Sequence, residues 1–266
     1  RHCRLLEAAD GWTALNLARE EDREVIPALT GASGEPWPAL EALARTLPAT
    51  EFRRRAVELQ LPVAVLGEAA PLPLAAPGGR QVPRKVVDLS ALWAGPLCAG
   101  LLARMGAEVV RVESLRRPDP TPQSSPRLDA LLNGGKRRVV LDLASDAGRA
   151  ELQALLGDAD AVVTSARPAA LARLGLEPAR FPHLAWVAIT AHGFSGEGAA
   201  RVGFGDDCAV AGGLVRWDAG EPRFLGDALA DPLTGLEAAT RVLAGSRGLI
   251  DMAMARVAAA HAERLA

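Results

Sequence analysis

Hydrophobic and polar positions alternate along the first quarter of the chain with two different periods. The run CRLLEAADGWTALNL carries apolar residues on both sides of Asp10-Gly11, a dipeptide favoured in tight hairpin turns. Three later runs have apolar residues at helical spacing, and a short apolar run follows them. These runs are 20–31, 36–47, 50–61 and then 62–66. The pattern predicts a hairpin, three helices and a short strand.

From Lys85 onward the pattern changes to short apolar runs that alternate with segments at helical spacing. The predicted strands are 85–90, 108–113, 137–143, 161–165 and 184–190, and the predicted helices are 96–106, 145–157, 168–175 and 206–215. Strands that are apolar on both faces and separated by helices are typical of a parallel sheet covered on both sides. The pattern therefore predicts an α/β fold.

A stretch rich in proline and glycine, AAPLPLAAPGGRQVPR, separates the two patterns. Such a composition is typical of an extended, semi-rigid connection. A chain of 266 residues can hold one large and one small domain. The predicted organisation is a small α+β domain over residues 1–68, a linker over 69–84 and a larger domain over 85–266.

Ligands of open parallel sheets bind outside the carboxyl ends of the strands. The candidate loops begin at Ser90, Glu113, Ser165 and Thr190. The glycines after the first strand do not form G-x-G-x-x-G, so this stretch does not favour a nicotinamide dinucleotide. Gly95 and Pro96 nevertheless suit the first turn of a helix, where free backbone amides attract anions. These residues alone leave a plain helix start and a phosphate site as alternatives.

The composition of the chain argues against several classes of protein. A formal net charge of −2 lacks the basic footprint of a nucleic-acid binder. No apolar run approaches the ~20 residues that cross a bilayer, so neither nucleic acid nor membrane is an expected partner. Three cysteines, far apart, indicate a reducing compartment, and the cytoplasm is the expected location.

Four separated segments, in their order along the chain, resemble the class III CoA-transferases. They are VVDLSALWAGPLCAGLLARMGAEVVRVE, LLNGGKRRVVLDL, DAVVTSARPAALARLGL and GDALADPLTGLEAATRVLAG, and the resemblance runs from Lys85 to about Met254. This family includes formyl-CoA transferase and carnitine CoA-transferase, and it is similar in sequence to the α-methylacyl-CoA racemases. The resemblance implies a Rossmann-like domain that binds coenzyme A, with the CoA thioester as substrate and no permanently bound cofactor.

The resemblance also implies which residues contact coenzyme A. The loop from Leu92 to Gly95 would lie along the CoA chain, and basic side chains near the sheet edge would hold its phosphates. Ser165 stands where the family often has asparagine. The implied CoA ligands are Trp93, Ala94, Gly95, Arg116, Lys136, Ser165, Arg167 and Arg173.

Asp231 is the candidate catalytic residue. It precedes Pro232 and an apolar-periodic helix, a position where aspartate is favoured as a cap and where free amides stabilise a carboxylate. From the residues alone, a cap is sufficient explanation. The resemblance implies a nucleophile in an acyl-CoA:carboxylate CoA-transferase: the aspartate attacks the donor thioester to give an anhydride, and CoA thiolate then gives an aspartyl-CoA thioester that the acceptor carboxylate resolves.

Two alternatives remain. Racemases of similar sequence pair this aspartate with a histidine, whose place Phe204 or Gly205 occupies here, and His192 is the nearby substitute. Asp206, Asp207 and Asp227 add acidic groups; the first two are also explained as a helix cap and first turn. The second alternative is a non-catalytic CoA-binding subunit.

The order of domains departs from the family. Members usually place the small domain after the nucleotide-binding half, whereas residues 1–68 come first here, and the chain is shorter than a typical member. The family forms interlocked dimers. The resemblance therefore implies an interlocked homodimer or a partner subunit that completes the site, acting on an acyl-CoA and a carboxylic acid.

Overall fold

The computed structural model describes residues 2–265, and its contacts divide the chain into two units, each described by itself. Unit 1 comprises the chain up to Pro73, Arg201–Asp231 and the chain from Met254 onward. Unit 2 comprises Leu74–Ala200 and Pro232–Ala253. The predicted boundaries at residues 68 and 84 group the chain differently, because two segments far along the sequence pack with the N-terminal one.

Unit 1 is built on an antiparallel sheet of β1 (Cys3–Ala8), β2 (Gly11–Asn16) and β3 (Val63–Val65). Ala8 pairs with Gly11 across the turn, so the hairpin predicted at Asp10-Gly11 is confirmed. Four helices follow the hairpin: α1 (Glu20–Glu24), α2 (Ile26–Thr30), α3 (Pro36–Thr46) and α4 (Ala49–Glu58). The helix predicted over 20–31 is thus two short helices, since Pro27 can start a helix but not continue one.

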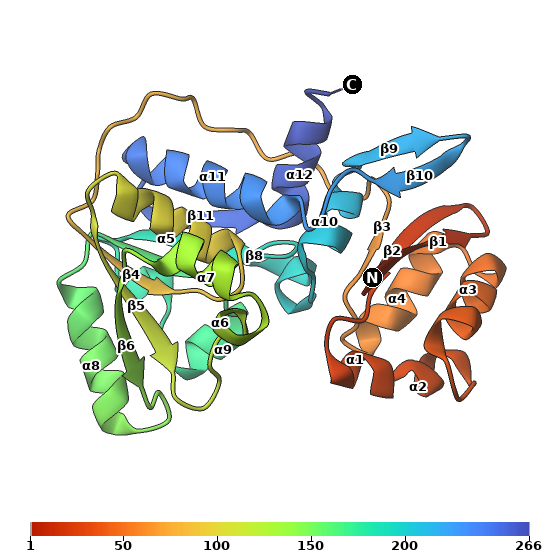
Figure 1. The fold of residues 1–266 in the computed structure, drawn as a ribbon, viewed down its shortest axis with the longest axis horizontal. Coiled ribbons are helices and arrows are strands. Elements are labelled where there is room, and N and C mark those ends of the chain that lie inside the picture. Colours follow the sequence, from red (N-terminus) through yellow and green to blue (C-terminus); the bar gives the residue numbers. More distant parts are fainter. Residues whose placement is uncertain (1, 266) are drawn as a thin grey trace. The chain divides into compact units, whose positions relative to one another are not determined.

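The two faces of this sheet are covered by different parts of the chain. Leu15 points to a core that includes Phe52 of α4, and the neighbouring Ala14 points to the opposite face. There it meets Val210 of α10 (Gly205–Ala211), which also contacts α12 (Met254–Ala262). An antiparallel pair, β9 (Val215–Asp218) and β10 (Glu221–Phe224), completes the unit; both strands and α12 are absent from the sequence prediction. Figure 1 shows these elements.

Unit 2 contains a six-stranded sheet in the order β11-β8-β7-β4-β5-β6, and every neighbouring pair is parallel. The strands are β4 (Lys85–Leu89), β5 (Glu108–Ser114), β6 (Arg137–Leu141), β7 (Ala161–Thr164), β8 (Ala185–Thr190) and β11 (Gly248–Ala253). Numbered by their sequence within the sheet, they follow the 3-2-1-4-5-6 order of the Rossmann fold. The predicted α/β class is confirmed, and β11 is a strand that the sequence pattern did not predict.

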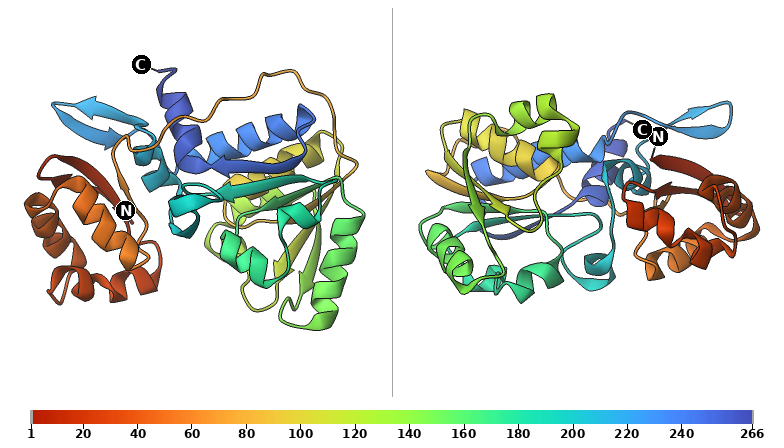
Figure 2. Two further views of the ribbon diagram at one scale, coloured as in Figure 1. Left: turned by 180° about the vertical axis from the view of Figure 1, so that it is seen from behind. Right: turned by 60° about the horizontal axis from the view of Figure 1, so that its bottom comes forward.

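Helices cover both faces of this sheet, as Figures 1 and 2 show. The helices with their bounds are α5 (Ala94–Arg104), α6 (Thr121–Ser124), α7 (Pro126–Asn133), α8 (Asp146–Gly157), α9 (Pro168–Arg173) and α11 (Ala230–Leu243), and two short 3-10 turns are η1 (Pro178–Arg180) and η2 (Gly196–Ala200). Leu152 of α8 and Leu171 of α9 pack in one core with Trp186 of β8. On the other face, α5 and α11 approach closely at Gly235, where a Cβ would lie 2.6 Å from Ala94 O.

The Pro- and Gly-rich stretch is bound to α11 within unit 2. Ala75 N donates to Glu237 Oε1 at 2.7 Å, and Gln81 N donates to Leu243 O at 2.9 Å. Among residues 2–265, no helix is long and apolar enough to span a membrane.

Candidate functional site

The point where the strand order reverses lies between β4 and β7, and the loops after these strands meet there. Ala91 N donates a hydrogen bond of 2.9 Å to Ser165 Oγ. Ser165, predicted from the end of a strand, therefore lies against the start of the predicted CoA loop. Crevices at such reversal points are where doubly wound sheets bind nucleotides.

The loop between β4 and α5 has an unusual backbone at Leu92. Its φ is +68°, a left-handed conformation that costs energy in a residue with a Cβ. Leu92 N donates to Asp119 Oδ2 at 3.2 Å, which helps to hold this conformation. The Leu92 side chain is exposed, Trp93 is half-buried and Ala94 is buried, so the solvent exposure of the side chains falls along the loop.

Gly95 is needed for close packing. A Cβ at this position would overlap the Ser90 side chain, so only glycine lets the first turn of α5 pass this close to the end of β4. Cys98, one turn further, is buried, and burial raises the pKa of its thiol.

Lys136, a predicted phosphate ligand, has no exposed side-chain surface. Its ammonium donates to Asp88 Oδ2 at 2.7 Å, Pro96 O at 2.8 Å and Asn133 Oδ1 at 2.7 Å. These bonds use all three N–H groups, although burial lowers the lysine pKa. In this arrangement Lys136 supports the first turn of α5 instead of presenting its charge to a ligand.

Arg111 is a buried cation that was not among the predicted site residues. It lies in β5 with a fully buried side chain and donates to Glu113 Oε1 at 2.9 Å and Asp119 Oδ2 at 2.5 Å. Its Nη1 also donates to Ser90 O at 3.4 Å, in the loop between β4 and α5. Burial opposes the charge, but the acidic partners outweigh it and raise the arginine pKa. A basic residue inside the apolar run EVVRVE was the available signal.

The other predicted phosphate ligands are on the surface. Arg116 is exposed and donates through two nitrogens to Asp142, each at 3.1 Å, and this bonding lowers the pKa of that carboxyl. Arg167 is exposed at the start of α9 and Arg173 is exposed at its end. The structure thus brings Ser165 and the Trp93–Gly95 loop together at one edge, whereas Lys136 is directed into the protein.

Asp231 belongs to unit 1 and lies in the first turn of α11, half-buried. Its Oδ2 lies so close to Gly205 that a Cβ at position 205 would overlap it. Glycine is therefore the residue that fits at position 205, one of the two positions, with Phe204, that correspond to the histidine of the similar racemases. Asp227 is exposed in the loop before the helix, so it does not share a helical turn with Asp231. His192 is half-buried after β8 in unit 2.

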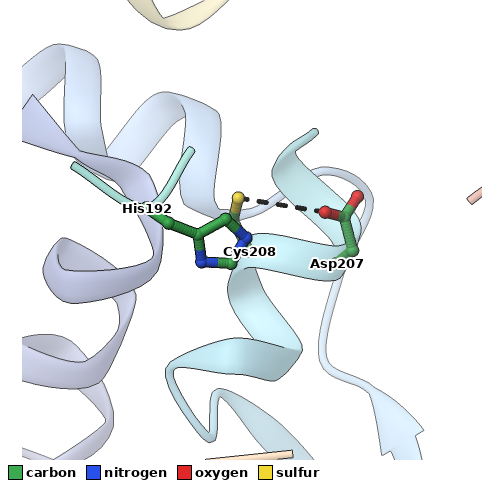
Figure 3. A group of neighbouring side chains, drawn as sticks. All are labelled: His192, Asp207 and Cys208. Atoms are coloured by element: carbon green, nitrogen blue, oxygen red, sulfur yellow. Dashed lines mark hydrogen bonds between the residues drawn. The ribbon is translucent and has the colours of Figure 1, made fainter. Parts of the chain in front are cut away.

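Asp207 is a fully buried carboxylic acid, and Figure 3 shows it beside Cys208 on α10. Its Oδ1 accepts hydrogen bonds from Phe204 N at 3.0 Å and Asn16 Nδ2 at 3.3 Å, so it caps α10, as predicted. Burial nevertheless raises the pKa of Asp207 to about 7. Burial also raises the Cys208 thiol pKa, which makes that thiol a poor nucleophile.

A family model for CoA-transferase family III matches residues 84–257. The match covers more than half of the chain and includes the loop after β4, β7 and Asp231. The chain belongs to the CoA-transferase family III, which confirms the resemblance drawn from its four segments.

Three curated relatives carry transferase names. An acyl-CoA transferase of Fusarium pseudograminearum is 30% identical in an alignment of 174 residues that covers 57% of this chain and 38% of that protein. A probable fatty acyl-CoA transferase of Mycobacterium tuberculosis, Rv3272, is 28% identical over 60% of this chain and 44% of its own length. A succinate–glutarate CoA-transferase of Agrobacterium fabrum is 30% identical over 66% of this chain and 51% of its own length. The chain spans about half the length, or less, of these relatives.

Two solved structures share the fold. The crystal structure of Rv3272 matches with a TM-score of 0.62 and 27% identity, over 71% of this chain and 59% of that chain. A CaiB/BaiF family protein from Brucella suis matches with a TM-score of 0.57 and 28% identity, over 68% of this chain and 55% of that chain.

Proposed function

We propose that this chain provides the CoA site and the nucleophile of an acyl-CoA:carboxylate CoA-transferase. The observation that carries the proposal is that one family match includes both the loop at the strand reversal and Asp231 in the first turn of a helix. Relatives named for succinate, glutarate and fatty acyl groups support acyl-CoA and carboxylate substrates.

Coenzyme A is proposed to lie along the loop formed by Trp93, Ala94 and Gly95, with Ser165 beside it. The exposed guanidinium groups of Arg116, Arg167 and Arg173 are proposed to pair with its phosphates, since guanidinium matches phosphate geometry. Arg116 would exchange its pairing with Asp142 for such a contact. Lys136 is better explained as a support of this loop, because its three donors are already used.

Asp231 is proposed to attack the carbonyl carbon of the donor thioester. The new C–O bond gives a mixed anhydride, the C–S bond breaks, and CoA leaves as thiolate. The thiolate attacks the aspartyl carbonyl, which releases the donor acid and leaves an aspartyl-CoA thioester. The acceptor carboxylate repeats these two steps in reverse, forming an anhydride, then a new acyl-CoA and free Asp231. This is nucleophilic catalysis by a carboxylate, and the helix start favours that anion electrostatically.

The test is to incubate the protein with succinyl-CoA or palmitoyl-CoA, quench with hydroxylamine and map the modified residue by mass spectrometry. A hydroxamate at Asp231 is the expected result, since both the anhydride and the thioester react with hydroxylamine. Asp231→Asn should abolish the label, and Asp227→Asn, an exposed acid four residues earlier, should keep it. An active preparation labelled elsewhere, or not at all, contradicts the proposal.

The same preparation separates the alternatives. A racemase would exchange the α-proton of a branched acyl-CoA with deuterated water and move no CoA to an acceptor. A non-catalytic subunit would bind coenzyme A with neither exchange nor label. The chain spans about half the length of its relatives, so an interlocked homodimer or a partner subunit is part of the proposal. The molecular mass measured by light scattering, with and without acyl-CoA, would distinguish the two. The cytoplasmic location stays a prediction.

A further inference from the structure

The first turn of α10 is linked to Asp231 by two consecutive hydrogen bonds within unit 1. Asp206 Oδ1 accepts a bond of 3.0 Å from Ala228 N. Ala228 O in turn accepts a bond of 2.9 Å from Asp231 N. One residue, Ala228, therefore connects the Asp206 side chain to the backbone of the proposed nucleophile.

Ala228 is held in a conformation that it would not adopt by itself. Its φ is +46°, in the left-handed region that disfavours residues with a Cβ. Such a conformation persists only where the surroundings hold it, and such residues gather at functional sites. The bond from Ala228 N to Asp206 Oδ1 is a specific restraint of this kind, because it fixes the peptide that precedes Ala228.

The Asp231 side chain is located against the same turn of α10. A Cβ at Gly205 would overlap both Asp231 Oδ2 and Ala228 O, so the carboxylate and this carbonyl both pack on the residue next to Asp206. The backbone of Asp231 is thus fixed through Ala228, and its carboxylate lies over Gly205. A shift of Ala228 would move both.

We propose that Asp206 is a positioning residue for Asp231, acting through Ala228, in addition to its place in the first turn of α10. The inference rests on the proposed nucleophilic role of Asp231. Asp206 need not touch the substrate; its oxygen keeps Ala228 left-handed and thereby keeps the Asp231 carboxylate in its attacking position. Residue 206 must provide a hydrogen-bond acceptor at this distance from its backbone; its negative charge is not required.

Two conservative variants separate placement from charge. Asp206→Asn keeps an acceptor oxygen at the same distance and removes the charge. Asp206→Glu keeps the charge and displaces the acceptor by one methylene. With succinyl-CoA or palmitoyl-CoA as donor, the rate of hydroxamate formation at Asp231 should stay within about threefold of the wild-type rate in Asp206→Asn. It should fall roughly 10- to 100-fold in Asp206→Glu, since a displacement of a reacting group by about 1 Å can cost roughly 10²-fold in rate.

The steady-state constants give a second readout. Asp206→Glu should lower kcat and leave the KM for acyl-CoA unchanged, because Asp206 acts on the nucleophile and not on CoA binding. Ala228→Gly relieves the strain of the left-handed conformation, since glycine adopts it readily. The loss caused by Asp206→Glu should therefore be smaller in the Ala228→Gly background, which a loss of overall fold would not produce.

The outcomes also distinguish this inference from the proposed function. If Asp231→Asn is inactive while Asp206→Glu labels Asp231 at the wild-type rate, the positioning role is wrong and the nucleophile stands. If Asp206→Asn is the slow variant and Asp206→Glu the fast one, charge and not placement is what matters, and the inference is overturned. If Asp231→Asn transfers CoA normally, the proposed function itself fails.

Discussion

Lys136 Nζ lies 2.7 Å from Asp88 Oδ2, and neither side chain has exposed surface. Asp88 belongs to β4, and Lys136 also donates to the carbonyl of Pro96 in the first turn of α5. The ion pair therefore joins the strand and the helix on either side of the proposed CoA loop. Its cost of desolvation is offset only while both partners are present.

Lys136→Met should destabilise the protein strongly. The variant removes the nearer of the two cations beside the buried Asp88 carboxylate and leaves only Arg111 Nη1, at 3.6 Å. Breaking a buried pair in this way costs roughly 3–5 kcal/mol of unfolding free energy. Denaturant unfolding followed by circular dichroism measures the loss. Arg84→Met, at an exposed pair with Asp158, is the control and should change stability by about 1 kcal/mol or less. The double variant Asp88→Asn/Lys136→Met should lose less unfolding free energy, relative to the wild-type protein, than Lys136→Met does. An equal or greater loss of unfolding free energy would contradict the pairing argument.

Gly95→Ala should weaken both the fold and CoA binding. The added methyl overlaps the Ser90 side chain, and overpacking of a tight contact costs roughly 1–3 kcal/mol. Because relief requires the loop before α5 to move, affinity for coenzyme A by titration calorimetry should fall about tenfold or more. Gly135→Ala is the control, since a Cβ there meets nothing within 4 Å. Equal affinities of the two variants for coenzyme A would mean that the loop is not part of the CoA site.

The sequence predicted the large sheet better than the small unit, for a physical reason. Strands such as Ala161–Thr164 are buried on both faces and produce continuous apolar runs that are visible locally. The β9–β10 hairpin is mostly exposed and has no such run. The packing of α10 on β2 joins residues about two hundred positions apart, and no local period records such a contact.

The candidate site was predicted in the same uneven way. Ser165 lies where a parallel sheet places the end of a strand, so topology alone put it near the loop after β4. The family resemblance implies that Lys136 is a phosphate ligand of coenzyme A, yet its side chain turns inward to Asp88. Arg111 was missed, although a charge in an apolar strand needs a buried partner. Direction of a side chain is decided by packing, which the local sequence does not show.

Gly205→Ala should reduce transfer without reducing CoA binding. A methyl group at this position displaces the Asp231 carboxylate, and a displacement of about 1 Å can cost roughly 10²-fold in rate. The kcat of CoA transfer measures the first effect, and titration calorimetry with coenzyme A measures the second. Gly226→Ala is a matched control in the same region, since the nearest atoms to its Cβ lie at 3.8 Å, an ordinary contact. A wild-type kcat in Gly205→Ala would show that Asp231 does not need its present position.

Asp207 should make stability fall as pH rises from about 4 to 7. Its pKa is about 7 in the folded protein, against an ordinary value of 3.8. Below pH 4 both states hold the proton; between these values the unfolded chain has released it while the folded protein retains it, so rising pH favours unfolding. A difference of about 3 pKa units at 1.36 kcal/mol each corresponds to roughly 4 kcal/mol.

Asp207→Asn isolates this contribution. Both backbone and Asn16 donors bond to Oδ1, so an asparagine oxygen can accept them while no charge is buried. The variant should match the wild-type protein in unfolding free energy near pH 4 and exceed it by an amount that grows up to pH 7 and levels off above it, measured by urea unfolding at each pH. Asp218→Asn, exposed at the β9–β10 turn, should follow the wild-type curve. Parallel curves for Asp207→Asn and the wild-type protein would mean that Asp207 is ionised in the fold throughout this range and that its buried charge is stabilised by its two donors.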